Sequence, residues 1–159
     1  MIELLLEQQR SFETPAAPAQ AFALLGAIPD SAAHFPGLEA LIPVPPDGYT
    51  WRLEKTGVGK LSLQASWTSR YTYEPEQGRV SWTPLPGGGN SQVSGQWRIT
   101  PRAGGSRIEF QNRALLTLPV PKLMKGMVEG FVRRENERLI DGYLANLGKT
   151  LAGGSGRLR

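Results

Sequence analysis

The stretch SRIEFQNRALLTLPVPKLMKGMVEGFVRRENERLIDGYLANLGKTL, residues 106–151, decides the fold because two hydrophobic periods meet inside it. Up to Leu118 apolar and polar residues alternate, which is typical of a strand with one buried face. From Val120 the apolar residues recur about every 3.6 positions, which predicts one long helix over 120–151 that ends before Gly153. The chain therefore closes with a long strand followed directly by a long helix.

The predicted helix has two apolar faces that point in different directions. Its first half would face the core through four residues, Met124, Met127, Val128 and Phe131. Its second half is centred on Tyr143 and Leu147, more than a quarter turn away at about 100° per residue. The two halves are therefore expected to pack against different partners, or to be joined by a bend.

Turn signals divide the chain before this segment into one strand, two short helices and a series of further strands. The opening strand, 2–13, has an apolar side that Gln8 and Arg10 interrupt. Helical signals follow over 18–26 and from residue 28 onward. The later strand signals cover residues 38–44, 48–55, 60–74, 78–84, 91–101 and 106–118. Short connections between successive strands predict an antiparallel meander.

All four tryptophans fall on the expected inner faces of these strands. In 60–74, Trp67 and Tyr71 share one face and polar residues occupy the other, so one face is buried and one is wet. Trp51, Trp82 and Trp97 take the corresponding position in their own strands. We therefore predict an α+β protein, in which a curved antiparallel sheet of about seven strands surrounds a long C-terminal helix, with two short helices after the first strand.

The bulk properties favour one folded domain. A length of 159 residues suits a single core, and 40% hydrophobic with 20% charged residues is not the composition of a disordered chain. We assign residues 1–152 to this domain and expect 153–159, GGSGRLR, to form a flexible basic tail.

The residue content excludes several kinds of chemistry. The absence of cysteine excludes disulfides, thiolate metal sites and a cysteine nucleophile, and the single histidine, His34, cannot by itself build a histidine-rich metal centre. We expect no cofactor and no metal site. No stretch is apolar and long enough for a spanning helix, and Glu3 and Glu7 stand where a secretory signal would need an apolar run. A cytoplasmic protein without an integral membrane segment is expected.

The positive charge of the chain raises the question of anionic partners. The net charge is +4 and the isoelectric point about 9.7, values that also occur in proteins that bind nucleic acids or anionic membranes. The basic residues are scattered among glutamates, apart from Lys122 with Lys125, Arg133 with Arg134, and the tail, so no long basic stripe forms. Nucleic-acid binding is not expected, whereas transient contact with a membrane surface stays open.

The order of elements resembles the START-like superfamily, also called SRPBCC, with its helix-grip fold. Residues 12–25, FETPAAPAQAFALL, are similar to the strand, proline turn and helix of its members. Residues 28–39, IPDSAAHFPGLE, are similar to the entry into the second strand in bacterial polyketide cyclase and lipid-transport members. GQWRITP at 95–101, followed by GSRIEF at 105–110, resembles their late strand pair. The resemblance extends to about Leu151, and it implies the fold far better than the substrate.

This resemblance implies a ligand cavity between the sheet and the long helix, open between residues 28–38 and the first half of that helix. The expected apolar wall consists of Trp51, Leu63, Trp67, Tyr71, Trp82, Trp97, Phe110, Met124, Met127, Val128 and Phe131. Asn112 and Glu135 are added as ligand-binding candidates because they are polar residues at or beside inner positions. Aromatic and methionine walls suit an adaptable apolar pocket, although the same residues would equally form a packed core.

Other conspicuous residues have simpler interpretations. Arg10 and Arg138 either orient a ligand or pair in water at the rim, and the second interpretation is favoured. His34 has no acidic residue at a diagnostic spacing and is expected in a surface loop. The glycine-rich segments 57–60 and 87–90 lack the pattern of a phosphate loop and are expected to be hairpin turns.

Three functions remain open at this point. The first is binding or carriage of a small apolar or amphipathic molecule, such as a lipid, a quinone or a polyketide-like compound, and it fails if no hydrophobic dye binds and no internal void exceeds about 300 Å³. The second is an aromatase/cyclase-like enzyme in which Arg10, Tyr71, Asn112 or Glu135 transfers protons, although no residue is assigned as catalytic. The third is a protein-interaction module with a solid core. Ligand identity, protein partners and oligomeric state are left open.

Overall fold

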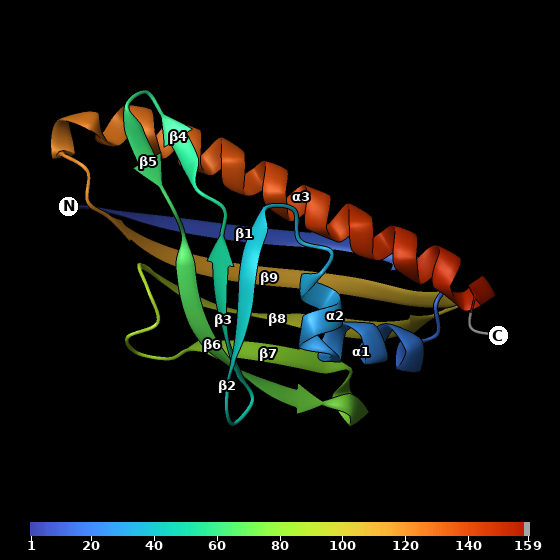
Figure 1. The fold of residues 1–159 in the computed structure, drawn as a ribbon. Helices are drawn as coiled ribbons and strands as arrows, with labels where there is room; N and C mark the ends of the chain where they lie inside the picture. The colour runs from blue at the N-terminus through green and yellow to red at the C-terminus, as the bar shows by residue number, and fades with distance from the viewer. Residues whose placement is uncertain (158–159) are drawn as a thin grey trace.

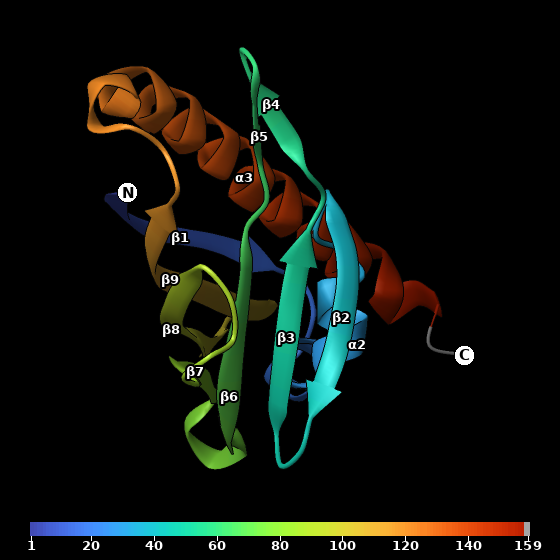
Figure 2. The same cartoon turned by 60° about the vertical axis from the view of Figure 1, so that its left-hand side comes forward.

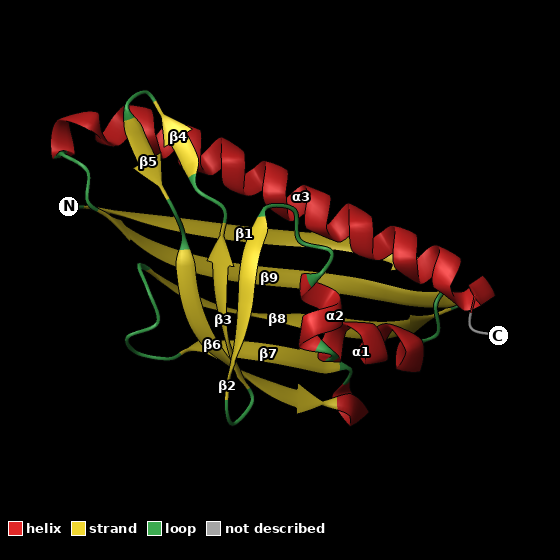
Figure 3. Cartoon of the chain, in the orientation of Figure 1, coloured by secondary structure: helices red, strands yellow, loops and turns green. Residues whose placement is uncertain are grey.

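The computed structural model describes the backbone of residues 1–157 and the side chains of residues 1–57 and 59–153. A seven-stranded antiparallel sheet curves around one long helix, and two short helices follow the first strand (Figures 1 and 3). The predicted α+β architecture is therefore confirmed.

Nine strands and three α-helices make up the described part of the chain. The strands are β1 (Ile2–Thr14), β2 (Leu38–Val44), β3 (Gly48–Leu53), β4 (Thr56–Val58), β5 (Leu61–Leu63), β6 (Ser66–Glu74), β7 (Arg79–Pro84), β8 (Ser91–Arg102) and β9 (Gly105–Leu118). The helices are α1 (Pro18–Gly26), α2 (Ile28–Ala32) and α3 (Lys125–Arg157), with short 3₁₀ turns η1 (Pro75–Gln77) and η2 (Lys122–Met124). The main sheet has the order β1-β9-β8-β7-β6-β3-β2.

The first and last strands of the chain pair along the full length of β1. The register runs from Ile2 opposite Leu118 to Thr14 opposite Ser106. Because side chains alternate along a strand, every second residue from Ile2 to Gln8 is buried on the concave face. The apolar side of β1 is thus the one that the alternation predicts, and Gln8 is its polar member.

The single strand predicted over 60–74 is divided into β5 and β6, which belong to different sheets. The break lies at Gln64 and Ala65, where a side chain replaces a neighbouring strand. Asn90 donates from Nδ2 to the Gln64 carbonyl oxygen over 2.7 Å, and its Oδ1 accepts from the Ser66 backbone N–H over 3.0 Å. The released segment pairs as the hairpin β4–β5, which projects beside α3 (Figure 2).

The long helix is present, but its first half packs through fewer residues than predicted. Val128 is fully buried and Phe131 is half-buried, whereas Met127 is 53% exposed, so its predicted core position is wrong. Met127 points away because it lies about 100° around the helix from Val128, and only one narrow row faces the sheet.

Within the described residues, no helix has both the length and the hydropathy that crossing a membrane requires.

The end of the helix also differs from the prediction. α3 continues to Arg157 instead of ending before Gly153. Residues 158 and 159 of the expected tail lie outside the described residues, and the division into residues 1–152 and a flexible tail stays a prediction.

The short helices are joined to the second half of α3 by polar contacts. The hydroxyls of Ser31 in α2 and Tyr143 in α3 are hydrogen-bonded at 2.5 Å, and both residues are buried. His34 contacts the Asp30 carbonyl oxygen through Nδ1 at 2.8 Å and the Thr150 hydroxyl through Nε2 at 2.7 Å. The second half of the helix therefore meets the short helices, as the change of apolar face predicts.

Candidate functional site

A cavity of about 230 Å³ lies between the concave face of the sheet and α3. Nine of the thirteen candidate residues line it, namely Trp51, Leu63, Trp67, Tyr71, Trp82, Trp97, Phe110, Asn112 and Glu135. The sheet residues predicted from strand alternation are thus brought together around one space. Its volume is below about 300 Å³, so the carrier hypothesis now depends on whether a hydrophobic dye binds.

The four candidates from the first half of the helix, Met124, Met127, Val128 and Phe131, are not among the lining residues. The helical part of the wall comes from the next turns, with Val132, Asn136, Leu139, Ile140 and Tyr143. The helix crosses the concave face further along its length than predicted. Its hydrophobic period indicates which side faces inward, but it does not indicate which turn lies opposite the open part of the sheet.

Aromatic rings form most of the apolar wall. Trp51 and Trp67 are stacked, with ring centroids 5.6 Å apart and planes 12° from parallel. The rings of Trp97 and Phe110, which also line the cavity, lie 4.6 Å apart. Tyr143 contacts Trp97 edge-on at 5.9 Å and thereby connects the helix to this wall. Such ring pairs are rigid and present flat apolar faces.

Phe35 and Tyr143 are lining residues that the candidate set missed. The rings of Phe35 and Tyr143 lie 5.1 Å apart. The apolar face of the second half of the helix, centred on Tyr143, was the signal that could have identified this part of the wall.

Two indole groups determine which hydrogen-bonding atoms the wall offers to the cavity. Trp51 donates from Nε1 to the Tyr71 hydroxyl oxygen over 2.9 Å, and Trp82 donates from Nε1 to Asn112 Oδ1 over 3.0 Å. Since indole can only donate, each pair occupies an acceptor atom. The Tyr71 O–H and the Asn112 Nδ2 group have no acceptor among the described residues, and both side chains line the cavity.

Asn136 adds a third donor from the helix. Its Nδ2 is buried and has no hydrogen-bond partner within the described part of the chain, and the residue lines the cavity. A buried donor without a partner costs about 1–3 kcal/mol, but this nitrogen is fully enclosed, so an acceptor in the cavity would reach it only if the Asn136 side chain moved. The wall therefore combines apolar rings with donors that come from β6 and β9.

The position of the Trp82 indole depends on a glycine in the neighbouring strand. Gly95 of β8 lies between Trp82 and Asn112 in the sheet register. A Cβ atom at this position would lie 2.8 Å from Trp82 Cζ2 and would also collide with the Gln111 carbonyl oxygen. The missing side chain lets the indole lie across β8 and reach the Asn112 amide.

Burial keeps the two cavity tyrosines protonated. Desolvation raises the pKa of Tyr71, and the nearby Tyr143 raises it further, whereas the hydrogen bond from Trp51 lowers it. Desolvation also raises the pKa of Tyr143, and its hydrogen bond with Ser31 opposes this shift. Near neutral pH both hydroxyls therefore keep a proton that they can donate, and neither acts as a base.

Exposed lining residues mark the mouth of the cavity. Glu54 and Lys55, from the link between β3 and β4, lie on one side, and Arg138 of α3 lies on the other. Arg138 donates through Nε to Glu135 Oε1 over 2.8 Å, so these two charges pair at the rim. These exposed residues lie beside the base of the β4–β5 hairpin. Phe35 and Gly37 of the predicted entrance region also line the cavity, and an entrance between residues 28–38 and the first half of the helix stays a prediction.

Two further candidates lie away from the cavity. Arg10 pairs with Glu137 and Asp141 of α3 at the surface, as the favoured interpretation predicts. Its pKa is raised mainly by the hydrogen bond to Asp141. His34 does not line the cavity and holds α2 to the end of α3.

The glycine-rich segment 57–60 forms the β4–β5 hairpin turn, and 87–90 joins β7 to β8, as predicted.

Comparison with known proteins identifies relatives of the whole domain. The family profile described as "Polyketide cyclase / dehydrase and lipid transport" matches residues 7–151. No curated protein matches the chain.

Several solved structures share the fold. TTHA0849 from Thermus thermophilus has a TM-score of 0.71 at 17% identity, with 94% of this chain and 99% of that one covered. The Zhui aromatase/cyclase from a Streptomyces species has a TM-score of 0.62 at 16% identity, with 97% of this chain and 95% of that one covered. The di-domain aromatase/cyclase StfQ of the steffimycin pathway has a TM-score of 0.64 at 14% identity, with 98% of this chain and 53% of that one covered. At these identities the likeness concerns the fold alone.

Proposed function

Because the chain belongs to the polyketide cyclase/dehydrase and lipid transport family, we propose that it binds a small apolar molecule in the cavity between its sheet and α3. The observation that carries this proposal is the cavity wall itself, where aromatic rings surround hydrogen-bond donors that lack acceptors. Apolar enclosure with a few polar groups is the usual composition of a small-molecule site.

The donors indicate the chemistry of the ligand. Tyr71 and Asn112 line the cavity, and their O–H and N–H groups have no acceptor among the described residues. A ligand that carries a carbonyl oxygen would satisfy at least one of these donors, whereas a plain hydrocarbon would leave all of them unpaired. We therefore favour a quinone or a polyketide-like ketone over an unfunctionalised lipid chain.

The volume and the wall shape favour a compact ligand. A cavity of about 230 Å³ is smaller than the typical range of about 300–1,000 Å³ for ligand sites. The flat faces of Trp51 and Trp67 are suited to stacking against a fused-ring system. A two-ring quinone is thus a better probe than a long acyl chain.

Titration calorimetry with two matched probes tests the proposal. Menadione and 2-methylnaphthalene share the fused rings and the methyl group, but only menadione has carbonyl oxygens. The chain has no cysteine, so menadione cannot form a thiol adduct with it. We expect menadione to bind about tenfold more tightly, and Tyr71→Phe to remove most of that preference.

A cavity-filling variant and a matched control locate the binding. Ala114 lines the cavity, so Ala114→Phe should weaken menadione binding by at least about tenfold, although overpacking can also cost about 1–3 kcal/mol of stability. Ala103→Phe places the same ring at an exposed position and should leave binding unchanged. Equal binding of the two probes would remove the carbonyl assignment. Absence of any binding, including that of a hydrophobic dye, would overturn the proposal and favour the interaction module.

A further inference from the structure

The segment that runs from η2 into the first turn of α3 exposes apolar side chains in a way that folding alone does not explain. Leu123 is fully exposed, and Met127, one turn further on, is 53% exposed. Single exposed apolar residues are ordinary, but two that lie four positions apart at a helix end form a small patch. Met124, half-buried between them, connects this patch to the core.

Lysines surround this patch. Lys122 and Lys125 are exposed, and neither makes an ion pair within the described residues. The first turn of α3 has no acidic residue. Carboxylates are favoured at the positive N-terminal end of a helix and lysines are not, so this arrangement opposes helix stability. An external anion at this end would reverse the effect.

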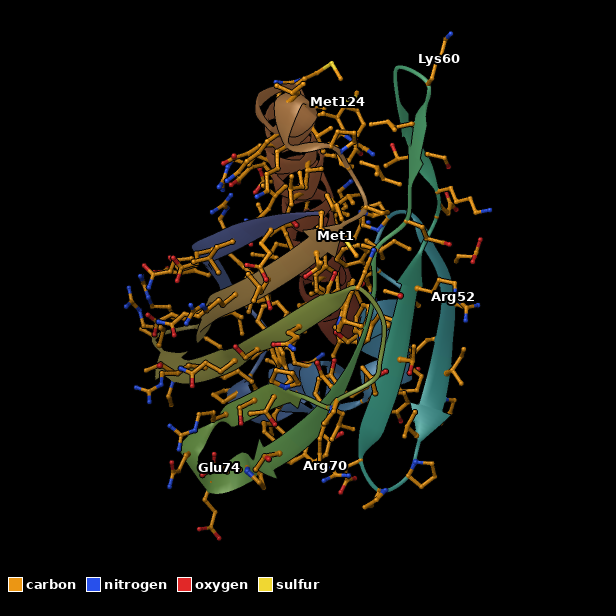
Figure 4. The ribbon with its side chains drawn as sticks, turned by 90° about the vertical axis from the view of Figure 1, so that its left-hand side faces the viewer. Met1, Arg52, Lys60, Arg70, Glu74 and Met124 are labelled. Carbon is orange, nitrogen blue, oxygen red and sulfur yellow. The ribbon has the colours of Figure 1, made fainter. Side chains whose placement is uncertain are left out.

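The tip of the β4–β5 hairpin lies at the same end of the molecule. Lys60 at this tip and Met124 near the start of α3 both lie at one end, whereas Arg70 and Glu74 lie at the other (Figure 4). The segment that leads into this hairpin carries Glu54 and Lys55 at the cavity mouth. A surface bound to this end would therefore contact the hairpin that borders the mouth.

We propose that this end of the protein, defined by Lys60, Lys122, Leu123, Lys125 and Met127, docks on anionic phospholipid bilayers. Two apolar side chains are too few to build the roughly 800 Å² per partner of a stable protein interface. They suffice for shallow insertion between lipid headgroups, with the lysines beside the phosphates. The inference goes beyond the proposed function, because it concerns the protein surface and does not require a ligand in the cavity.

Flotation with lipid vesicles tests this docking surface. The full chain is mixed with vesicles of phosphatidylcholine, with or without phosphatidylglycerol, over a series of salt concentrations. We expect partitioning only with phosphatidylglycerol and weaker binding as salt rises. Lys122→Glu with Lys125→Glu should reduce the partition coefficient by at least about twentyfold, and Leu123→Ser with Met127→Ser by about tenfold.

Matched variants separate this surface from the general positive charge. Arg70→Glu with Lys149→Glu makes the same change in net charge at two other exposed positions and should have little effect. Ala114→Phe, which fills the cavity, should float like the parent, so failure of the ligand proposal would not affect this test. The inference is overturned if the parent does not float. It is also overturned if the Arg70 and Lys149 variant loses as much vesicle binding as the Lys122 and Lys125 variant, or if replacing Leu123 and Met127 leaves vesicle binding unchanged. Leu123-dependent self-association without flotation would assign the patch to a second copy of the chain.

Discussion

Trp82 of β7 and Asn112 of β9 are hydrogen-bonded over 3.0 Å although a whole strand, β8, separates their strands. The indole lies across Gly95, which has no side chain to obstruct it. One acceptor atom is thereby satisfied, and the Asn112 amide can direct its N–H groups into the cavity. The hydrogen-bonding character of the site thus depends on a residue that touches no ligand.

Gly95→Ala should destabilise the protein by about 1–3 kcal/mol, because the new methyl group must displace the Trp82 ring or the Gln111 carbonyl. Urea unfolding followed by tryptophan fluorescence measures the change. Gly126→Ala is the control, since a Cβ there meets nothing within 4 Å and alanine favours a helix. Equal stability of the two variants would contradict the close packing described around Gly95.

Alkaline pH should destabilise the protein through its buried tyrosines. The folded-state pKa values of Tyr71 and Tyr143 are raised, so above the ordinary tyrosine pKa of about 10 the unfolded chain releases protons that the folded protein keeps. The free energy of unfolding should then fall by about 1.4 kcal/mol per pH unit for each tyrosine, and these two groups should add no pH dependence below that point. Tyr71→Phe should remove one such contribution from the slope. A tyrosinate absorbance titration in which all four tyrosines ionise before unfolding would contradict this expectation.

When side chains in the first half of α3 are truncated to alanine, the loss in free energy of unfolding should depend on how buried each side chain is and not on its size alone. Met127→Ala should change the free energy of unfolding by less than about 0.5 kcal/mol, because the side chain is largely exposed. Phe131→Ala should cost less than the about 3–5 kcal/mol of a fully packed ring, since Phe131 is half-buried. Thermal or urea unfolding gives the ranking, and a large loss from Met127→Ala would show that α3 is rotated from the position described.

His34→Ala should separate stability from binding. The variant loses contacts to the Asp30 carbonyl and the Thr150 hydroxyl, at a cost of about 0.5–1.5 kcal/mol each. Menadione affinity should stay within a few-fold of the parent, because His34 does not line the cavity. A hundredfold loss of binding or turnover in a folded variant, about 2.7 kcal/mol, would instead favour an enzyme that uses this histidine.

Local patterns were sufficient to predict most elements and the sheet side of the cavity. Strand alternation correctly placed Trp51, Trp82 and Trp97 on the inner face, because the side-chain period of a strand relates neighbouring residues directly. Strand alternation could not predict the break between β5 and β6. It depends on Asn90, which is distant in the sequence and has no local sign of its partners.

The helical wall was harder to predict for a related reason. Periodicity identifies the inward side of α3, but the turn that meets the cavity depends on how far the helix is displaced along the sheet. Val132, Asn136 and Tyr143 therefore line the cavity in place of Met124 and Met127. The unpaired donors of Tyr71 and Asn112 likewise depend on indole contacts that only the assembled sheet defines.

The pairing of β1 with β9 has a consequence for how the chain acquires its structure. While the protein is synthesised, the apolar row of Ile2, Leu4 and Leu6 has no strand to join until residues up to Leu118 have left the ribosome. Contacts between such distant parts of a chain slow folding, although the entropic cost of closing the loop grows only slowly with its length. The first strand must therefore stay uncovered, and prone to aggregation, until β9 has been synthesised and can pair with it.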